Sequence, residues 1–487
     1  MDKIKAYQQV LVDDKGRERI FHGVNFCDKS DYTPGEQIVP DLDEAMIQKI
    51  AANGVNLIRL GFTWAKLEPK PGEYNDAYID ALAKVLDLFE KYNIYAFLDM
   101  HQDLYSSVTN SDGAPEWAVL LDGIKVKPTR FVWAEGYFWG KACHRAFDNF
   151  WANRKVNGKG LQEYYTECWS YVVKKLGDKP AVIGFDIMNE PFPGSSGGTV
   201  FKKIVANAVK TVLFDKDVKR TQLIKELFNK EDAIGKVLTH IDYNVFNKIT
   251  SSADDLIREF DTKVYGPFVS KVAAKIREES DKLIFMENCY YSNLGIPFSA
   301  PPITVNGKRD ENQLFAPHAY DLMVDTSAYK FASNDRVGGI FGEHKRSQER
   351  LGVPVIVGEW GSFGDETDDW LPHIQYLFEV FENNKWGQTY WAYIPGFFEN
   401  RLMKVFLRPY PKAVSGVIES YHYDLNSKTF TLTFTQGEDA CGETIIGTPF
   451  EVESVTLDGA DYPIDCANYE LIIKTTAGRH TIKVKVK

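Results

Sequence analysis

The sequence predicts an α/β fold, a (β/α)8 TIM barrel followed by a small C-terminal antiparallel β-sandwich. Over residues 1–416, eight short apolar runs alternate with amphipathic helical or loop segments. Alternation of strand and helix is typical of a parallel sheet, and eight repeats close a barrel. From about residue 417 to 487 the pattern changes to short alternating strands separated by Gly and Asp turns. That texture is typical of an antiparallel sandwich.

The individual elements follow from local signals. Asp13–Gly16 is a turn signal, so residues 1 to about 17 are expected to form a hairpin. Gly54 follows the amphipathic stretch 41–53 in the manner of a helix C-cap, and residues 76–91 and 161–176 are further expected helices. The eight expected barrel strands lie at 20–26, 55–60, 95–101, 181–189, 283–287, 314–318, 354–359 and 389–393.

Two long segments interrupt this alternation. Residues 102–151 are rich in aromatic side chains, and they form either a hydrophobic cover over the barrel mouth or an ordinary packed excursion. Residues 191–281 are Lys-rich and helical, too long for one barrel helix, so we expect a helical insertion at about 200–265. A lid or partner-binding role and a solvated decoration are both open for it, and the pattern favours the decoration.

Composition and charge limit the classes of partner. The chain has 487 residues, 44% of them hydrophobic, and a net charge of −11. That charge argues against nucleic acid or an anionic membrane as the principal partner, because both attract basic surfaces. Six cysteines without a CxxC pair suggest neither a zinc site nor a redox motif, although Cys441 and Cys466 would be able to pair in an exported protein. The start, Met1–Lys5, is polar and shows no export signal.

Two glutamates end apolar strands and carry the functional prediction. Glu190 follows the run 185–189 and Glu359 follows 354–358, and the two are 169 positions apart in the chain. Barrel enzymes place their chemistry at the carboxyl ends of the strands, so a closed barrel would bring both glutamates to one opening. Hydrolysis of a glycosidic bond needs one protonated and one ionised carboxyl group in this arrangement.

Other polar side chains are expected at the same opening because they also follow strands. Arg59 is expected to pair with Glu359 and keep that carboxylate ionised as the nucleophile. Asn189 is suited to bond the 2-hydroxyl of the sugar. The remaining members of this set are Asn25, Lys29, Asp99, His101, His318, Tyr320 and Trp391.

These remaining side chains have tasks of their own in a sugar site. His318 and Tyr320 are expected to orient the carboxylates, and Trp391 to form a flat floor for the sugar ring. Lys29, Asp99 and His101 are the expected partners of the other hydroxyls. The alternative is a polar network whose members satisfy one another without a ligand.

The motifs together resemble family 5 of the glycoside hydrolases, over about residues 18–416. They are Gly-Val-Asn-Phe at 23–26, Arg59, Met-His-Gln-Asp at 100–103, Asn-Glu-Pro at 189–191, His-x-Tyr at 318–320 and Gly-Glu-Trp at 358–360. The runs at 99–103, 113–118, 145–151, 186–191 and 409–414 narrow the resemblance to the endoglycoceramidase and glycosylceramidase group. The Lys-rich stretch is longer than that group leads us to expect.

The resemblance implies a barrel with a C-terminal β-sandwich that releases the glycan from the ceramide of glycosphingolipids. It implies that Glu190 is the acid/base and Glu359 the nucleophile. It also implies the residues that bind the sugar next to the lipid, which are Lys29, Asp99, His101, Trp151, Asn189, His318, Tyr320 and Trp391, with Arg59 in support.

The favoured hypothesis is therefore a retaining glycosidase that works by double displacement on a glycolipid or other β-glycoside. Two alternatives within catalysis are an exo-acting β-glucosidase on glucosylceramide or steryl glucosides and a cellulase-like endo-β-glucanase on soluble polysaccharide. A non-catalytic carbohydrate-binding or lipid-binding protein is the alternative from another class. No metal or organic cofactor is implied, because two carboxylates suffice. As partners we expect no nucleic acid, transient contact with a membrane or micelle surface, and a monomer.

Overall fold

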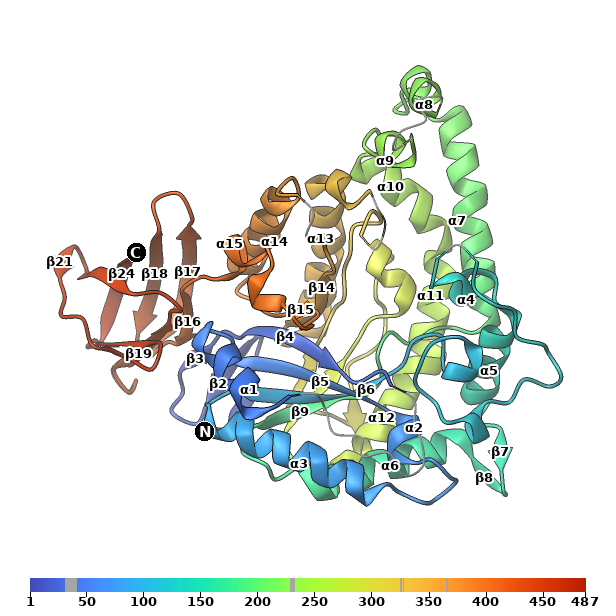
Figure 1. Cartoon of the computed structure of the whole chain (residues 1–487), viewed down its shortest axis with the longest axis horizontal. Helices are drawn as coiled ribbons and strands as arrows, with labels where there is room; N and C mark the ends of the chain where they lie inside the picture. Colours follow the sequence, from blue (N-terminus) through green and yellow to red (C-terminus); the bar gives the residue numbers. More distant parts are fainter. Residues whose placement is uncertain (31–41, 131, 228–232, 325, 327, 365–366) are drawn as a thin grey trace.

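The computed structural model describes residues 1–30, 42–130, 132–227, 233–324, 326, 328–364 and 367–487 of the chain. Eight parallel strands form its centre and confirm the predicted barrel (Figure 1). In chain order they are β4 (His22–Cys27), β5 (Leu57–Thr63), β6 (Tyr95–His101), β9 (Val182–Asp186), β10 (Leu283–Met286), β13 (Gln313–Phe315), β14 (Ile356–Gly361) and β15 (Gly387–Trp391). The expected strands coincide with these within a few residues, because long apolar runs mark buried parallel strands.

The sheet runs in the order β13, β10, β9, β6, β5, β4, β15, β14. Two parallel bridges, Phe315 to Val355 and His318 to Glu359, join its outer strands. The barrel is thereby closed, and the second bridge lies at the carboxyl ends of the strands. Closure is what brings side chains from distant parts of the chain to one opening.

Amphipathic helices cover the outside of the barrel. In α3 (Asp76–Lys91) the apolar positions recur at helical spacing, so Ile79, Leu82 and Leu86 are buried against the strands. Asn75 caps the start of α3, accepting a hydrogen bond from the backbone of Tyr78. The other helices of this layer include α1 (Glu44–Ala52), α2 (Trp64–Leu67), α6 (Leu161–Leu176), α12 (Gly266–Ile276), α13 (Asn334–Leu351) and α14 (Leu371–Asn384).

The predicted N-terminal hairpin exists and closes the amino-terminal end of the barrel. β1 (Ile4–Tyr7) pairs with β2 (Val10–Asp13), which pairs with β3 (Glu18–Arg19). Ile4 and Leu11 of this hairpin join a buried cluster with Leu57, Phe97 and other inward-facing residues of the barrel strands. The opposite, carboxyl-terminal end is left for the site.

The two interruptions are helical. The first contains α4 (Glu135–Trp139) and α5 (Lys141–Trp151). The second contains α7 (Ser195–Phe214), α8 (Arg220–Leu227), α9 (Ala233–Leu238), α10 (Tyr243–Thr250), α11 (Asp254–Phe260) and a π-helical turn (Asp261–Tyr265) that leads into α12. Figure 1 shows α7 rising away from α4 and α5, with α8 at its far tip.

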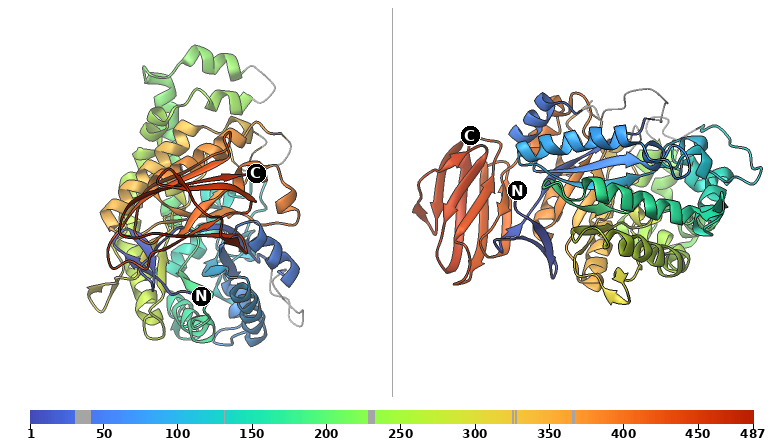
Figure 2. Two further views of the ribbon diagram at one scale, coloured as in Figure 1. Left: turned by 90° about the vertical axis from the view of Figure 1, so that its left-hand side faces the viewer. Right: turned by 90° about the horizontal axis from the view of Figure 1, so that it is seen from below.

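The C-terminal region is a two-layer antiparallel sandwich (Figure 2), as predicted. One sheet contains β16 (Tyr410–Ala413), β19 (Glu443–Gly447), β23 (Glu470–Lys474) and β22 (Cys466–Ala467). The other contains β17 (Val417–Asp424), β18 (Thr429–Gln436), β24 (Gly478–Val486), β20 (Val452–Leu457) and β21 (Ala460–Asp461). Cys441 and Cys466 are both free and exposed. Among the described residues, no helix has the length and apolar character needed to cross a bilayer.

Candidate active site

Glu190 lies in a sharp turn just beyond β9, and its backbone is held in an unusual conformation. Its φ angle is +40°, a region that non-glycine residues rarely adopt. The backbone N–H of Glu190 donates to Oε2 of Glu287 at 2.7 Å, and its carbonyl accepts from Nε2 of Gln102 at 3.2 Å. Two buried side chains from neighbouring strand ends therefore fix the turn that aims the Glu190 carboxyl group into the barrel mouth.

Glu359 lies on β14 across the mouth from Glu190 and is bound by two donors. Nη1 of Arg59 donates to its Oε1 at 2.7 Å, and the hydroxyl of Tyr320 donates to its Oε2 at 2.8 Å. Each oxygen of the carboxyl group therefore has its own donor, and Arg59 adds a positive charge beside it. Arg59 and Tyr320 thus occupy the positions that the sequence suggested for them.

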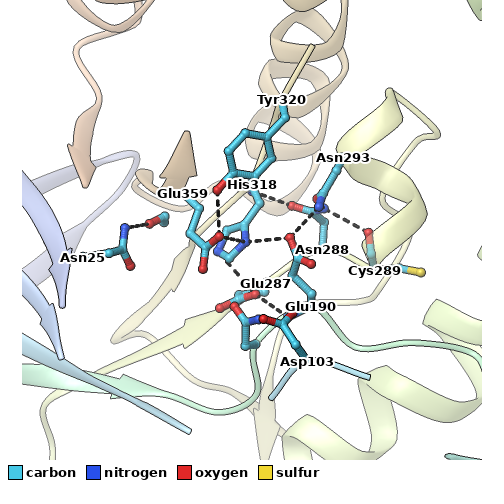
Figure 3. Close-up of polar contacts among 12 residues, drawn as sticks. Asn25, Asp103, Glu190, Glu287, Asn288, Cys289, Asn293, His318, Tyr320 and Glu359 are labelled. Atoms are coloured by element: carbon cyan, nitrogen blue, oxygen red, sulfur yellow. Dashed lines mark hydrogen bonds and ion pairs between the residues drawn. The ribbon is translucent and has the colours of Figure 1, made fainter. Parts of the chain in front are cut away.

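The carboxyl groups of Glu190 and Glu359 lie beside each other, with His318 as their common neighbour (Figure 3). Nδ1 of His318 is 3.1 Å from Oε1 of Glu190 and 3.6 Å from Oε2 of Glu359. One oxygen of each glutamate and the imidazole lie within 4.8 Å of one another. This separation is close to that of the two carboxyl groups in retaining glycosidases, about 5 Å, and shorter than in inverting ones.

The two glutamates have different surroundings, and those of Glu190 favour the protonated form. Burial raises the pKa of Glu190 to about 7, and the negative charge of Glu359 acts in the same direction, whereas the hydrogen bond from His318 opposes it. Nδ2 of Asn293 also donates to Oε1 of Glu190 at 2.5 Å. The pair thus combines a carboxyl group that keeps its proton near neutral pH with one that is held by a cation.

Arg59 is completely buried beneath the pair and binds four carboxyl groups. They belong to Glu359 at 2.7 Å, Glu287 at 2.5 Å, Asp99 at 3.0 Å and Asp186 at 3.0 Å. Burial by itself would lower the pKa of Arg59, but these four neighbours raise it well above its ordinary value. The guanidinium is therefore a fixed positive charge under the floor of the site.

Glu287 connects Arg59 with Glu190 and His318. Its Oε1 accepts from Arg59, its Oε2 accepts the backbone N–H of Glu190, and Nε2 of His318 lies 3.4 Å from Oε2. Despite burial, His318 and Arg59 lower the pKa of Glu287 to about 2. Burial and the charge of Glu287 raise the pKa of Asp186 well above its usual range, so the carboxyl groups of this cluster do not all ionise together.

A second polar cluster borders the pocket. Lys29 forms an ion pair with Asp103, and its Nζ lies 3.7 Å from Asp112 and 4.7 Å from the centre of the Trp391 ring. His101 stacks on Trp391 with ring centres 5.2 Å apart. Lys29 and Trp391 line the pocket at this end, next to Glu359. The arrangement offers an aromatic face and hydrogen-bonding groups to a sugar ring.

Five of the eight expected sugar-binding residues do not line the pocket: Asp99, His101, Trp151, Asn189 and His318. Asp99 is buried below the pocket, where it binds Arg59 and Nδ1 of His101 at 2.8 Å, and it does not line the cavity. Asn189 uses its amide within the protein, with Oδ1 accepting from Arg59 at 2.9 Å and Nδ2 donating to the carbonyl of Gln102 at 3.0 Å. Asp99 and Asn189 therefore support the floor of the site. Their positions at strand ends, which are all that the sequence shows, are equally compatible with this role and with contact to a sugar.

Trp151 also lies away from the pocket, and its ring packs among helices. It packs against Phe260 and Phe268 with ring centres 5.3 and 5.4 Å away, and its Nε1 donates to the carbonyl of Phe192 at 2.7 Å. It does not line the pocket. Trp151 is the last residue of α5, and its ring is held between Phe260 of α11 and Phe268 of α12, away from the barrel mouth.

The pocket above the pair has a volume of about 620 Å³. Its polar end contains Glu190, Glu359, Lys29, Asp103 and Asn293. The rest of the lining is mainly apolar and includes Val132, Trp133, Ala134, Phe138, Phe201, Ile204, Tyr290, Tyr291, Leu294, Leu322, Val324 and Trp391, together with the polar residues Ser111, Tyr320, Asp321 and Thr326. Residues 132–138 of the aromatic-rich segment thus form part of a cover over the barrel mouth, which was one of the two expectations for this segment. Helix α7 contributes another wall of the pocket.

Three groups of acidic and histidine side chains in the described part of the chain have the spacing of metal ligands. Two of them already surround a protein cation. Asp99, Asp186 and Glu287 enclose Arg59, and His101, Asp103 and Asp112 adjoin Lys29. The third consists of Glu190, His318 and Glu359. In the first two groups the positive charge that the carboxylates need comes from Arg59 and Lys29.

Sequence reasoning missed several members of the site. Glu287 carried the same signal as Glu190 and Glu359, because it directly follows the apolar strand β10. Gln102 and Asp103 were within a quoted motif without a role. Asn288 and Asn293 gave no sequence signal, yet Asn288 donates to Oδ1 of Asn293 at 2.6 Å and thereby orients the amide that contacts Glu190.

Comparison with known proteins gives consistent matches over the chain. Residues 12–224 and 239–396 match the family model of cellulase, glycosyl hydrolase family 5, and residues 408–486 match the glycoside hydrolase family 5 C-terminal domain. An endoglycoceramidase of Hydra vulgaris is 26% identical over 479 residues, covering 90% of this chain and 78% of that protein. Endoglycoceramidase I of Rhodococcus hoagii is 31% identical over 190 residues, which are 38% of this chain and 36% of that protein.

Solved structures share the fold over nearly the whole length. The ganglioside GM3 complex of endo-glycoceramidase II from Rhodococcus sp. superposes with a TM-score of 0.76, at 23% identity. The superposition covers 99% of this chain and all of that chain. At this level of identity the likeness establishes the common architecture.

Proposed function

The chain belongs to glycoside hydrolase family 5, and on that premise we propose that this glycosidase releases the glycan of glycosphingolipids from ceramide with retained configuration. The observation that carries the proposal is the position of the Glu190 and Glu359 pair. It lies where the polar end of a pocket meets its apolar walls. A glycolipid has the same division, with a sugar on one side of the scissile bond and hydrocarbon on the other. The endoglycoceramidase relatives support the same substrate class.

In the first step Glu359 is the nucleophile. Its carboxylate, oriented by hydrogen bonds from Arg59 and Tyr320, attacks the anomeric carbon and forms a glycosyl ester. Glu190 gives its proton to the glycosidic oxygen, which leaves as the primary alcohol of ceramide. Its pKa of about 7 supports this role, since the proton is retained near neutral pH.

In the second step Glu190 acts as a base. Its carboxylate, now ionised, takes a proton from a water that attacks the anomeric carbon from the side the lipid has left. The ester bond breaks, Glu359 is regenerated as a carboxylate, and the sugar is released with the configuration it had in the lipid. His318 contacts both carboxyl groups and is placed to stabilise the charge as it passes from one to the other.

The apolar walls are the expected place of the lipid. These walls include Trp133, Phe138 and Ile204. Each of these side chains removes apolar surface from water when a hydrocarbon chain occupies the pocket, which favours binding. The sugar is expected at the opposite end, beside Lys29 and Trp391. Because the substrate resides in membranes or micelles, the enzyme makes transient contact with such a surface.

The substrate is tested by incubation with lactosylceramide, glucosylceramide, a steryl glucoside and a soluble β-glucan, followed by chromatography of the products. Release of intact lactose from lactosylceramide is expected. Cleavage of glucosylceramide or the steryl glucoside without lactosylceramide would replace the proposal with an exo-acting enzyme. Cleavage of the glucan alone would replace it with an endo-β-glucanase.

The roles of the two glutamates are tested separately. Glu359→Gln is expected to abolish turnover of every substrate, whereas Glu190→Gln loses far less on an aryl lactoside with a good leaving group, because that group departs without a proton. Glu399→Gln is the matched control, since Glu399 is 65% exposed and pairs with Lys49 at the surface. Normal turnover by Glu359→Gln would contradict the assignment.

A further inference from the structure

Helix α7 begins at the pocket and continues well beyond it with apolar side chains in solvent. Four of them form what we call the α7 ridge: Val205, Val209, Leu213 and Phe214, which are 45, 55, 56 and 73% exposed. The first three are spaced by four residues and therefore lie along one face of the helix. The opposite face packs on the protein through residues such as Val200, Ile204 and Ala208.

The ridge is continuous with the wall of the pocket. Phe201 lines the pocket and precedes Val205 by one helical turn. Trp139, which is 51% exposed, packs on Phe201 with ring centres 5.7 Å apart, and Trp133 is exposed beside the same opening. Apolar surface thus extends from the lipid-facing wall outward along α7.

The segment that carries the ridge is basic, although the whole chain has a net charge of −11. Residues 195–227 contain seven Lys and Arg and only three Asp and Glu. The seven are all exposed: Lys202, Lys203, Lys210, Lys216, Lys219, Arg220 and Lys225. Two of the three acids, Asp215 and Asp217, are paired with Lys248 at 3.0 and 2.7 Å. Positive charge therefore predominates on this segment.

The projection of α7 lets this local charge act by itself. A helix of 20 residues is about 30 Å long, and its outer end stands away from the barrel in Figures 1 and 2. Charges are screened over about 8 Å at physiological ionic strength, so the acidic remainder of the protein contributes little at the tip. The net charge of the whole chain argues against an anionic surface as the principal partner. The local positive charge of residues 195–227 instead favours an anionic partner for this segment.

We propose that the α7 ridge and its flanking lysines dock the protein on an anionic lipid bilayer, with the apolar side chains entering the interface and the lysines contacting lipid phosphates. An exposed apolar face with basic flanks is the pattern of helices that lie in a membrane interface. Docking in this way places the pocket mouth next to the surface from which a glycolipid is drawn. The purpose of docking rests on the proposed function, but vesicle binding can be measured whether or not the protein cleaves glycolipids.

Flotation with vesicles measures docking directly. The full-length protein is mixed with vesicles of phosphatidylcholine alone or with about 30 mol% phosphatidylserine. We expect the bound fraction to be about tenfold higher with phosphatidylserine, and to fall as salt is raised from about 0.1 M to about 0.5 M. Equal binding to both vesicles would overturn the anionic part of the proposal.

Two variants with matched controls separate the apolar and the charged contributions. The ridge variant is Val209→Ser/Leu213→Ser/Phe214→Ser, and the charge variant is Lys202→Glu/Lys203→Glu/Lys210→Glu. For each variant we expect the fraction bound to vesicles and the rate of hydrolysis of vesicle glycolipid to fall about tenfold. Hydrolysis of a soluble aryl lactoside is expected to remain within about twofold of the wild type, which shows that the fold is intact. The controls are Tyr7→Ser/Val417→Ser/Ile464→Ser and Lys84→Glu/Lys474→Glu/Lys483→Glu, which change exposed residues elsewhere.

Several outcomes would overturn the proposal. One is flotation of both variants at the wild-type level. Another is a wild-type dimer in light scattering that the ridge variant dissociates, without vesicle binding, since a second copy would then cover the ridge. If the wild type floats through the ridge but cleaves no glycolipid even in detergent micelles, docking stands and the proposed substrate fails.

Discussion

The Glu190 carboxyl group illustrates how neighbours with opposite effects set one chemical property. Burial and the nearby Glu359 raise its pKa, while His318 opposes them through a hydrogen bond and its charge. The result, a pKa of about 7, differs from the ordinary value of 4.5 for an exposed glutamate. A glutamate at a strand end was predictable from the sequence, but this balance of effects on its pKa depends on Glu359 and His318, which lie far away in the chain.

The pKa of Glu190 predicts the alkaline limb of the activity profile. Because Glu190 must be protonated when the lipid alcohol leaves, kcat/KM is expected to fall as pH rises above about 7. Asn293→Ala removes a hydrogen-bond donor to the Glu190 carboxylate. Loss of this donor disfavours the ionised form and raises the pKa of Glu190, so the alkaline limb is expected to move to higher pH. Rates on lactosylceramide across pH 5 to about 9 check this. A limb unchanged in the variant would contradict the contact.

Glu287 is predicted to position Glu190 without touching substrate. Glu287→Gln replaces a charged acceptor of the Glu190 N–H, and hydrogen bonds to charged groups contribute about 1.5–3 kcal/mol. We expect kcat/KM to fall by about 10- to 100-fold. Loss of a negative charge also favours ionisation of the neighbouring Glu190, so the alkaline limb is expected to move to lower pH. A purely structural role would reduce the rate and leave the limb in place, and the pH profile of the variant distinguishes the two.

At the scale of elements, the N-terminal hairpin and α7 show two ways in which a segment outside the barrel serves it. β1 and β2 bring Ile4 and Leu11 into the cluster that fills the amino-terminal end of the barrel. α7 instead gives Phe201 and Ile204 to the pocket and leaves its outer part in solvent. The outer part is exposed, as expected of a solvated decoration, whereas the inner part is a wall of the pocket, and a lid role for it stays a prediction.

The packing of the hairpin can be measured by truncating one side chain. Leu11 is 4% exposed, so Leu11→Ala is expected to lower the free energy of unfolding by about 2–5 kcal/mol. Urea denaturation followed by fluorescence checks this. Tyr7→Ala is the matched control on the same hairpin, because Tyr7 is 59% exposed and its truncation is expected to change stability by about 0.5 kcal/mol at most. Equal effects of the two would contradict the packing.

At the scale of the molecule, the barrel and the sandwich are joined by buried charges. Nη1 of Arg408 donates to Oε1 of Glu382 on α14 at 2.6 Å, and Nδ1 of His422 on β17 lies 2.7 Å from the other oxygen. The backbone of Glu18 also bonds with that of Val414 at 2.9 Å, and its Oε2 accepts the N–H of Ile418 at 2.8 Å. The sandwich is thus tied to both ends of the barrel sequence.

Breaking this junction is predicted to affect stability but not chemistry. Glu382→Gln leaves the 3% exposed side chain of Arg408 without its charge partner, which is expected to cost about 3–5 kcal/mol. Differential scanning calorimetry is expected to show a lower transition temperature. The kcat/KM on a soluble aryl lactoside is expected to stay at the wild-type value below the transition. Glu419→Gln is the control, because its pair with Arg479 is exposed.

The sequence by itself determined the barrel, the sandwich and the position of most residues that surround the mouth. Apolar runs of strand length and turn signals are local, so eight strands and two strand-end glutamates are visible without a structure. The third strand-end glutamate, Glu287, was equally visible and was overlooked.

Only the tertiary structure decided which of these side chains face a ligand and which support others. Asp99 and Asn189 lie below the pocket around Arg59, and Trp151 packs among helices, because side-chain contacts depend on closure of the barrel and on the helices that cover it. The exposure of the α7 ridge was decided in the same way. Periodicity identifies the two faces of a helix. How much of the apolar face is buried depends on how far the neighbouring helices extend along it.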